Sequence, residues 1–259
     1  MHRNLRRDRL PAMAWAAAPA NAPLLGAQSF SFRHFDFFGA LAQLRALGLD
    51  AMEFCSVHFP PDAGHPEFSR VQAAIRDAGV TVPCFGVEGF TADEAANRKK
   101  FEFAKALGVR ILTADPTPDS FDNLDRLCDE FGIMIAIHNH GPGARYDKVA
   151  DTAAAVKDHS PLIGACVDTG HVIRSAEKPN EVIEQLGARV LSLHLKDWSF
   201  GGEEEILGQG DLYLGKVAEA LDAIGFAGPL IMEYENSPDN PVPEMKLGFE
   251  NWRKAVARA

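Results

Sequence analysis

Two histidines stand at the end of an apolar run in IAIHNHGPG, residues 135–143. Only one residue separates His138 from His140, so both would share a face of a strand, because alternate residues of a strand point the same way. Imidazoles in this position can bind a metal ion or transfer a proton near neutral pH. Which chemistry the pair performs depends on the other side chains that reach the same place.

Three later apolar runs end in side chains of the same kinds. They contribute Asp168 and His171 in VDTGH, His194 and Lys196 in LHLKD, and Glu233 in IMEYE. A lone histidine at a strand end is usually a hydrogen-bonded structural group, but four of the nine histidines of the chain fall in these positions. The runs therefore predict a shared site if they are neighbouring strands.

An alternation of apolar runs and helical patterns begins at residue 24 and repeats eight times. The predicted strands are LLGAQSFSF, AMEFCS, TVPCFGV, RILTADP, IMIAIHNH, IGACVDTGH, VLSLHLKD and PLIMEYE. The segments between them, such as LGKVAEALDAIG, space their apolar residues as an amphipathic helix does. Alternating strands and helices predict a parallel sheet, and eight units fit a single (β/α)8 TIM barrel. The alternative, an open doubly wound sheet, lacks the GxGxxG that would follow the first strand.

The barrel is predicted over residues 23–259, and residues 1–22 are set apart as a leader. The leader begins with the basic stretch MHRNLRRDRL and continues with the alanine-rich PAMAWAAAPANA. This pattern resembles a degenerate twin-arginine export signal, and a disordered leader is the alternative. A cytoplasmic location is expected, with the periplasm as the alternative. No run of 18 apolar residues exists, so no membrane span is predicted.

Composition excludes several other classes of function. The net charge of −10 argues against a nucleic-acid partner. The four cysteines, Cys55, Cys84, Cys128 and Cys166, form no CxxC pair, so they are expected to be buried thiols rather than zinc ligands. Apolar residues on the predicted outer helices leave a homo-oligomer open.

The carboxyl ends of the strands carry the chemistry of a TIM barrel, so the polar run ends are expected to meet there. The proposed metal ligands are His138, Asp168, His194 and Glu233. Imidazole with carboxylate suits one divalent ion of Mn, Co, Zn or Fe rather than Ca²⁺. Without a cation, two carboxylates in the barrel mouth would repel each other. The alternative is a polar, hydrogen-bonded plug.

Six segments in this order and spacing resemble the sugar phosphate isomerase/epimerase family of xylose isomerase-like barrels, which includes inosose dehydratases and endonuclease IV-type repair enzymes. They are QSFSFR, IHNHGP, VDTGH, LHLKD, ILGQGDL and IMEYE, within residues 24–256. The resemblance implies a divalent metal held by Glu, Asp, His and Glu, which fall on His138, Asp168, His194 and Glu233. His138 departs from this pattern, because sugar epimerases usually carry an acid/base glutamate there. The histidine-x-histidine pattern is closer to inosose dehydratases. His171 matches a family residue that contacts a substrate oxygen.

The remaining candidates surround this predicted metal. Glu233 is the first candidate for the base and His140 the second. Lys196 would hold a substrate oxygen, with a salt bridge to a carboxylate as the alternative. Glu53 would replace the acid/base group that His138 does not supply, with orientation of a histidine as the alternative. Arg33 would bind a hydroxyl or phosphate of the substrate, or else form a structural bridge at the barrel top.

The predicted reaction starts with removal of a proton next to a carbonyl, which a metal would promote as a Lewis acid. We predict a metal-dependent isomerase or epimerase that acts on a keto sugar or related polyol through an enediolate. A lyase that dehydrates an inosose or 3-keto sugar is the close alternative. A repair endonuclease is disfavoured by the acidic charge. A non-catalytic sugar-binding barrel also stays open, because fold alone does not determine function.

Overall fold

The computed structural model describes residues 23–257. The predicted leader, residues 1–22, lies outside this range, and so do the last two residues. Within the described range, none of the helices is both long and apolar enough to cross a membrane.

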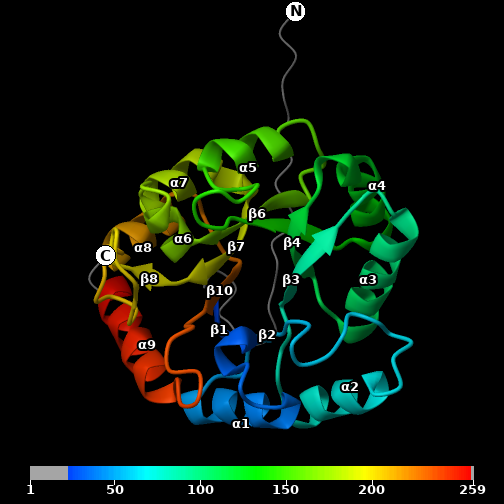
Figure 1. The fold of residues 1–259 in the computed structure, drawn as a ribbon, viewed down its shortest axis with the longest axis horizontal. Coiled ribbons are helices and arrows are strands. Elements are labelled where there is room, and N and C mark those ends of the chain that lie inside the picture. The colour runs from blue at the N-terminus through cyan, green and yellow to red at the C-terminus, as the bar shows by residue number, and fades with distance from the viewer. Residues whose placement is uncertain (1–22, 258–259) are drawn as a thin grey trace, which may run out of the picture.

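Eight parallel strands form a sheet that curls into a nearly closed barrel (Figure 1). In sheet order they are β2 (Met52–Glu53), β1 (Leu24–Gln28), β10 (Pro229–Met232), β7 (Val190–Leu195), β6 (Ile163–Asp168), β5 (Met134–His138), β4 (Ile111–Pro116) and β3 (Cys84–Phe90). Isolated parallel bridges, Ala51 to Thr81 and Phe54 to Phe85, connect β2 to β3. This arrangement confirms the predicted (β/α)8 barrel and excludes the open doubly wound sheet.

Helices connect the strands and lie outside the barrel wall (Figure 1). They are α1 (Phe37–Leu47), α2 (Phe68–Asp77), α3 (Glu94–Leu107), α4 (Phe121–Phe131), α5 (Val149–Val156), α6 (Thr169–Arg174), α7 (Pro179–Leu186), α8 (Leu214–Ala223) and α9 (Val242–Val256). The described chain also contains the 3-10 helices η1 (Ser29–Phe32), η2 (Pro118–Ser120) and η3 (Gly187–Arg189), and an antiparallel pair, β8 (Asp197–Trp198) and β9 (Glu204–Glu205). Helix α3 illustrates how sequence sets the helix ends: Asp93 accepts a hydrogen bond from the backbone N–H of Ala96, and Gly108 ends the helix at φ 85°.

The two faces of the sheet carry different side chains. On β5, Ile135 and Ile137 belong to the large apolar cluster between the sheet and the helices. Met134 and Ala136 belong to a small cluster inside the barrel, which also includes Cys84 and Cys166. Because side chains alternate, His138 continues the inner column of β5 toward the barrel mouth, as predicted. All four cysteines are buried free thiols, which confirms that expectation.

The first strand is shorter than the sequence predicts. It ends at Gln28, and the chain turns at once into η1. The side-chain carbonyl of Gln28 causes this turn, because it accepts hydrogen bonds from the backbone N–H of Phe30 and from the hydroxyl of Ser29. Arg33 consequently follows a 3-10 helix and does not stand at a strand end.

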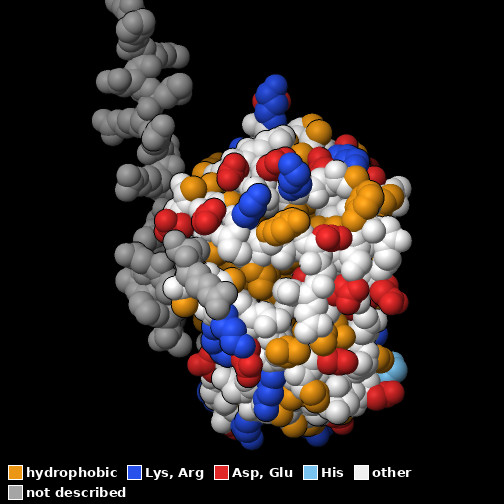
Figure 2. Space-filling model, turned by 90° about the vertical axis from the view of Figure 1, so that its left-hand side faces the viewer, with side chains coloured by type: hydrophobic (Ala, Val, Ile, Leu, Met, Phe, Trp, Pro, Cys, Tyr) orange, Lys and Arg blue, Asp and Glu red, His pale blue; other side chains and the backbone are white. Residues whose placement is uncertain are grey.

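Figure 2 shows the face on the left of Figure 1, where α8 and α9 lie. Basic side chains lie among acidic and apolar ones on this face. A nucleic-acid backbone would require a continuous basic track. This face does not provide one, in keeping with the net charge of −10.

We expect Gly164→Ala to destabilise the barrel. Gly164 lies in β6, and a Cβ atom at this position would lie 2.2 Å from the carbonyl oxygen of Arg189 and 2.8 Å from Leu191 Cγ. Relieving such a contact with backbone requires a shift of β6 or β7, so the free energy of unfolding should fall by about 1–3 kcal/mol. Urea unfolding measures this loss. The control is Gly89→Ala in β3, where a Cβ would have no neighbour within 4 Å. Equal stability of the two variants would contradict the expectation.

Candidate metal centre at the carboxyl end of the barrel

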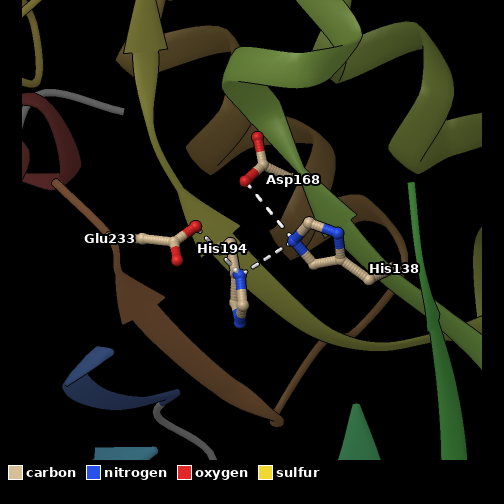
Figure 3. A group of neighbouring side chains, drawn as sticks. All are labelled: His138, Asp168, His194 and Glu233. Carbon is tan, nitrogen blue, oxygen red and sulfur yellow. Dashed lines mark hydrogen bonds and ion pairs between the residues drawn. The ribbon is translucent and has the colours of Figure 1, made fainter. Parts of the chain in front are cut away.

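Four predicted ligands converge at the carboxyl ends of β5, β6, β7 and β10 (Figure 3). One ligand atom each from His138, Asp168, His194 and Glu233 lies within 4.8 Å of the other three. His138 Nε2 lies 3.0 Å from His194 Nδ1 and 3.5 Å from Asp168 Oδ2. His194 Nδ1 lies 3.6 Å from Glu233 Oε2. Ligands that each lie about 2.1 Å from one ion are about 3–4 Å apart, so these spacings suit a shared cation.

The strand register produces this convergence. Asp168 pairs with His194 across β6 and β7, so their inward side chains start at the same level. His138 pairs with Cys166, two residues before Asp168. His194 pairs with Ile231 on β10, two residues before Glu233. Residues two apart share a face of a strand, and all four side chains therefore point into the barrel mouth.

The state of Asp168 supports a cation at this point. The carboxylate is fully buried, and its Oδ1 accepts a hydrogen bond of 2.8 Å from the backbone N–H of His171. Its Oδ2 faces the other ligands and has no hydrogen-bond partner among the described residues. The nearest donors, His138 Nε2 at 3.5 Å and Lys196 Nζ at 3.7 Å, lie too far away for a good hydrogen bond, and an unsatisfied buried carboxylate oxygen costs free energy. The donor set of two imidazoles and two carboxylates fits a divalent transition-metal ion that would satisfy this oxygen.

Glu53 lies behind the ligands. Its Oε2 is 3.0 Å from His194 Nε2, and both side chains are fully buried. A carboxylate on the far nitrogen of an imidazole fixes the ring so that the near nitrogen, here Nδ1, faces a metal. Glu53 does not line the cavity described below, so this placement suits the orienting role that we gave as the alternative to acid/base chemistry.

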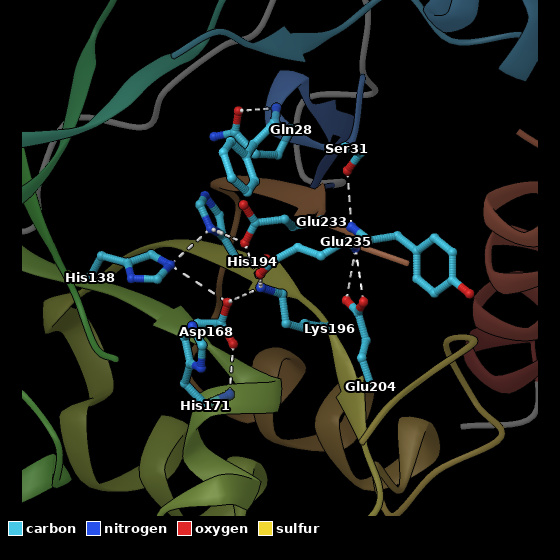
Figure 4. A network of polar contacts seen from close by, with 12 residues as sticks. Gln28, Ser31, His138, Asp168, His171, His194, Lys196, Glu204, Glu233 and Glu235 are labelled. Atoms are coloured by element: carbon cyan, nitrogen blue, oxygen red, sulfur yellow. Dashed lines mark hydrogen bonds and ion pairs between the residues drawn. The ribbon is translucent and has the colours of Figure 1, made fainter. Parts of the chain in front are cut away.

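Lys196 is buried among three carboxylates (Figure 4). Its Nζ lies 2.9 Å from Glu233 Oε2, 2.5 Å from Glu235 Oε1 and 3.7 Å from Asp168 Oδ2. Burial alone would lower the pKa of Lys196, but Glu233, Asp168 and Glu235 raise it well above its ordinary value. Burial would likewise raise the pKa of Glu233, but Lys196 and His194 hold it below its ordinary value. Lys196 thus forms the salt bridge given as the alternative to a substrate contact.

Two further carboxylates hold the segments around the site through backbone N–H groups. Glu204 accepts from the backbone N–H of Glu235 at 2.9 and 3.0 Å (Figure 4). It also accepts from the N–H of Asn236 at 2.8 Å, and these bonds fix the chain just after β10. Burial raises the pKa of Glu204 to about 7, although Lys196 and these N–H groups oppose the shift. Asp197 accepts from three N–H groups of the ILGQGDL loop. This loop is therefore fixed to the start of β8, just after β7, and it does not line the cavity.

A cavity of about 480 Å³, a size that suits a small molecule, is bordered by two of the four ligands, His138 and Glu233. Its lining residues are Gln28, Phe30, Cys55, Ser56, Val57, Gly86, Val87, His138, His140, His171, Arg174, Glu233 and Glu235. The first-choice base, Glu233, and the second, His140, both border this cavity, as does the substrate candidate His171. Arg33 does not, because it donates to the carbonyl oxygens of Glu235 and Phe30 and so forms the structural bridge given as its alternative.

Two of the histidines that line the cavity, His140 and His171, are uncharged at neutral pH. Burial, with a contribution from His138, lowers the pKa of His140 to about 4. Burial also lowers the pKa of His171 to about 4, against the opposing effect of Asp168. A neutral imidazole has one donor and one acceptor nitrogen. Both rings can therefore accept a proton or exchange hydrogen bonds with the hydroxyl groups of a bound molecule.

Gln28 and Arg174 are among the cavity residues that were not singled out from the sequence. Gln28 stands at the true end of β1, and its Nε2 donates to the carbonyl oxygen of Gly86 at 3.2 Å. Arg174 follows His171 by three residues, so both lie on one face of α6. The spacing of three residues between His171 and Arg174 could have identified Arg174 as a cavity residue. Using it would have required the knowledge that the strand ends at Asp168 and that a helix follows.

A family model described as a xylose isomerase-like TIM barrel matches residues 41–255. The chain is similar to 3-oxo-isoapionate decarboxylase of Pectobacterium atrosepticum, with 26% identity over 65% of this chain and 63% of that protein. It is also similar to an inosose dehydratase of Clostridium beijerinckii, with 27% identity over 46% of each chain. The chain thus spans about half to two thirds of the length of these curated relatives.

Solved structures show the same fold. An L-ribulose 3-epimerase superposes with a TM-score of 0.71 at 17% identity and covers 91% of this chain and 95% of its own. A xylose isomerase domain protein from Planctomyces limnophilus gives a TM-score of 0.71 at 17% identity, over 92% of this chain and all of that one. Identities this low support the shared fold and leave the reaction to the site itself.

We expect Glu204→Gln to change how stability depends on pH. The pKa of Glu204 rises from 4.5 to about 7 on folding, so the folded chain holds this proton more tightly than the unfolded chain. Between these values a rise in pH should therefore remove up to about 3 kcal/mol of stability from the wild type, and the glutamine variant should not suffer this loss.

Urea unfolding at pH 5 and pH 8 measures the difference. The control is Glu219→Gln, which removes an exposed carboxylate of α8. A stability gap between wild type and Glu204→Gln that is the same at both pH values would refute the expectation.

Proposed function

The chain belongs to the xylose isomerase-like TIM-barrel family, and we propose that it is a metal-dependent isomerase or epimerase of a keto sugar or related polyol. The observation that carries the proposal is the convergence of His138, Asp168, His194 and Glu233 beside a cavity of small-molecule size. These residues would hold one Mn, Co, Zn or Fe ion. When bound, this ion would polarise a substrate carbonyl and stabilise the enediolate that forms as the neighbouring proton leaves.

Glu233 is the proposed base. It borders the cavity, and the ammonium of Lys196 at 2.9 Å keeps it ionised and ready to accept a proton. Glu53 orients His194 from behind and takes no part in proton transfer. His171 contacts a substrate hydroxyl from the β6 side of the cavity.

His140 is the proposed second acid/base group. It borders the same cavity from the end of β5, whereas Glu233 borders it from the end of β10, with β6 and β7 between them. Isomerisation and epimerisation both require one group to remove a proton and a group to return one. An imidazole and a carboxylate on different sides of a bound sugar can divide these tasks.

A lyase that dehydrates an inosose or 3-keto sugar is the second candidate. The histidine at position 138 favours it, because sugar epimerases of the resembling family usually carry glutamate there. Inosose dehydratases are also among the similar proteins. The same base would start this reaction, and the proton that Glu233 removes would leave with the β-hydroxyl as water. The neutral His140 would donate a hydrogen bond to the departing oxygen.

We expect Asp168→Asn to lose the metal. Wild-type protein purified without chelator should contain about one equivalent of Mn, Co, Zn or Fe, because the four donors suit such an ion. The variant should contain much less, since it replaces a charged ligand by a neutral amide. Plasma mass spectrometry measures both. The control is Asp115→Asn, which alters a half-exposed carboxylate paired with Arg145. Wild-type protein that takes up no metal, even with added Mn²⁺ or Co²⁺, would rule out the proposal.

We expect His140→Asn to retain its metal and to slow proton transfer by about 10²-fold or more. The measurement follows keto sugars and inososes in D₂O by NMR and mass spectrometry. A deuterium-labelled product that otherwise has the elemental composition of the substrate indicates isomerisation or epimerisation. A product that has lost one water indicates dehydration. Unchanged rates in the variant would contradict the role of His140, and loss of metal would show that it is a ligand instead.

A further inference from the structure

Arg174 contributes the one cationic side chain to the described lining of the cavity. It ends α6 and lies on the β6 side, whereas Glu233 and Glu235 follow β10, with β7 between. Both glutamates are already engaged by Lys196. Arg174 therefore presents its positive charge to a part of the cavity that these carboxylates do not occupy.

The guanidinium of Arg174 has no acidic partner within 4 Å among the described residues. Its side-chain hydrogen bond is to a neutral group, from Nη1 to His171 Nδ1 at 2.8 Å. The guanidinium also lies over the ring of Trp198, whose centroid is 4.7 Å from the guanidinium carbon. A guanidinium carries five N–H donors, so most of them stay free for a ligand.

The surroundings hold this guanidinium in place. Stacking on Trp198 and the bond to His171 restrict its rotation, which lowers the entropic cost of binding. Gly141 provides the space: a Cβ atom there would lie 2.8 Å from the guanidinium carbon. Gly141 is the first glycine of the Gly-Pro-Gly turn after His140. The turn thus leaves room for Arg174 at the cavity.

We propose that Arg174 binds an anionic group of the substrate, a carboxylate or a phosphate, so that the proposed reaction acts on an acidic sugar derivative rather than a neutral sugar. The inference rests on the proposed function for the identity of the site. A planar guanidinium matches both anions by paired hydrogen bonds. Because His171 Nδ1 accepts from Arg174, the proton of the neutral ring lies on Nε2. The residue that binds the anion therefore also sets the hydrogen-bonding state of His171.

The test compares binding of 2-keto-D-gluconate, D-fructose 6-phosphate and D-fructose by isothermal titration calorimetry. At least one anionic probe should bind wild-type protein more tightly than D-fructose, and added NaCl should weaken only the anionic probes. Arg174→Gln should weaken the preferred anion about 10-fold or more and should weaken D-fructose much less, since D-fructose would feel only the change at His171. Arg174→Lys should recover part of the loss, since it retains the charge without the paired geometry.

Gly141→Ala provides an independent variant. It should displace the guanidinium of Arg174 and weaken binding of the same anionic probe, although the positive charge of Arg174 remains. The control is Arg145→Gln, whose guanidinium pairs with Asp115 outside the cavity lining. It should leave all three affinities unchanged. Preference for the sugar acid assigns a carboxylate, and preference for the sugar phosphate assigns a phosphate.

Anionic probes that bind wild type no better than D-fructose, or that bind Arg174→Gln as tightly as wild type, overturn the proposal. Repeating the titrations after chelator treatment separates it from the metal-dependent reaction. An Arg174-dependent preference for the anion that survives in metal-free protein supports the anion site even if the metal chemistry fails. A preference that is insensitive to Arg174 and disappears with the metal overturns the anion site and leaves the metal centre standing.

Discussion

The buried ammonium of Lys196 is the interaction on which the site depends. Asp168 and Glu233 bring two negative charges into the barrel mouth, where low polarity makes unpaired charge costly. Lys196 lies between them and also engages Glu235. Gly170 makes this position available, since a Cβ there would lie 2.6 Å from Lys196 Cγ. The carboxylates can therefore remain ionised in a buried position, which both ligation and proton removal require.

The polar groups around this centre divide into those that face the cavity and those that hold the others. Glu53 fixes the ring of His194, Glu204 fixes the chain after β10, and Asp197 fixes the loop after β9. Each acts on a backbone N–H or an imidazole rather than on the cavity. Such support restricts the ligands to one geometry, and rigid placement is what a metal centre and an oriented substrate need.

The cavity itself is asymmetric. Carboxylates border it from β10, whereas imidazoles and a guanidinium that has no acidic partner among the described residues border it from β5 and α6. In the proposed mechanism, a carboxylate and a neutral imidazole would therefore face a bound molecule from different sides. This asymmetry distinguishes the site from the pair of glutamates that the resembling sugar epimerases use, and it is compatible with an acidic substrate anchored at Arg174.

The sequence by itself determined the barrel, the strands that carry chemistry and the inward face of each. Those features follow from local periodicity and from the order of strands and helices, which a chain displays residue by residue. Only the tertiary structure decided what each polar residue contacts. Glu53 and His194 lie 141 residues apart in sequence, so no local pattern could show that one orients the other. Likewise, Arg33 lies outside the cavity because the chain turns after Gln28, whose side chain caps η1. Arg174 borders the cavity because a helix follows Asp168, whose side chain caps α6. Each cap changes the direction of the chain within three residues.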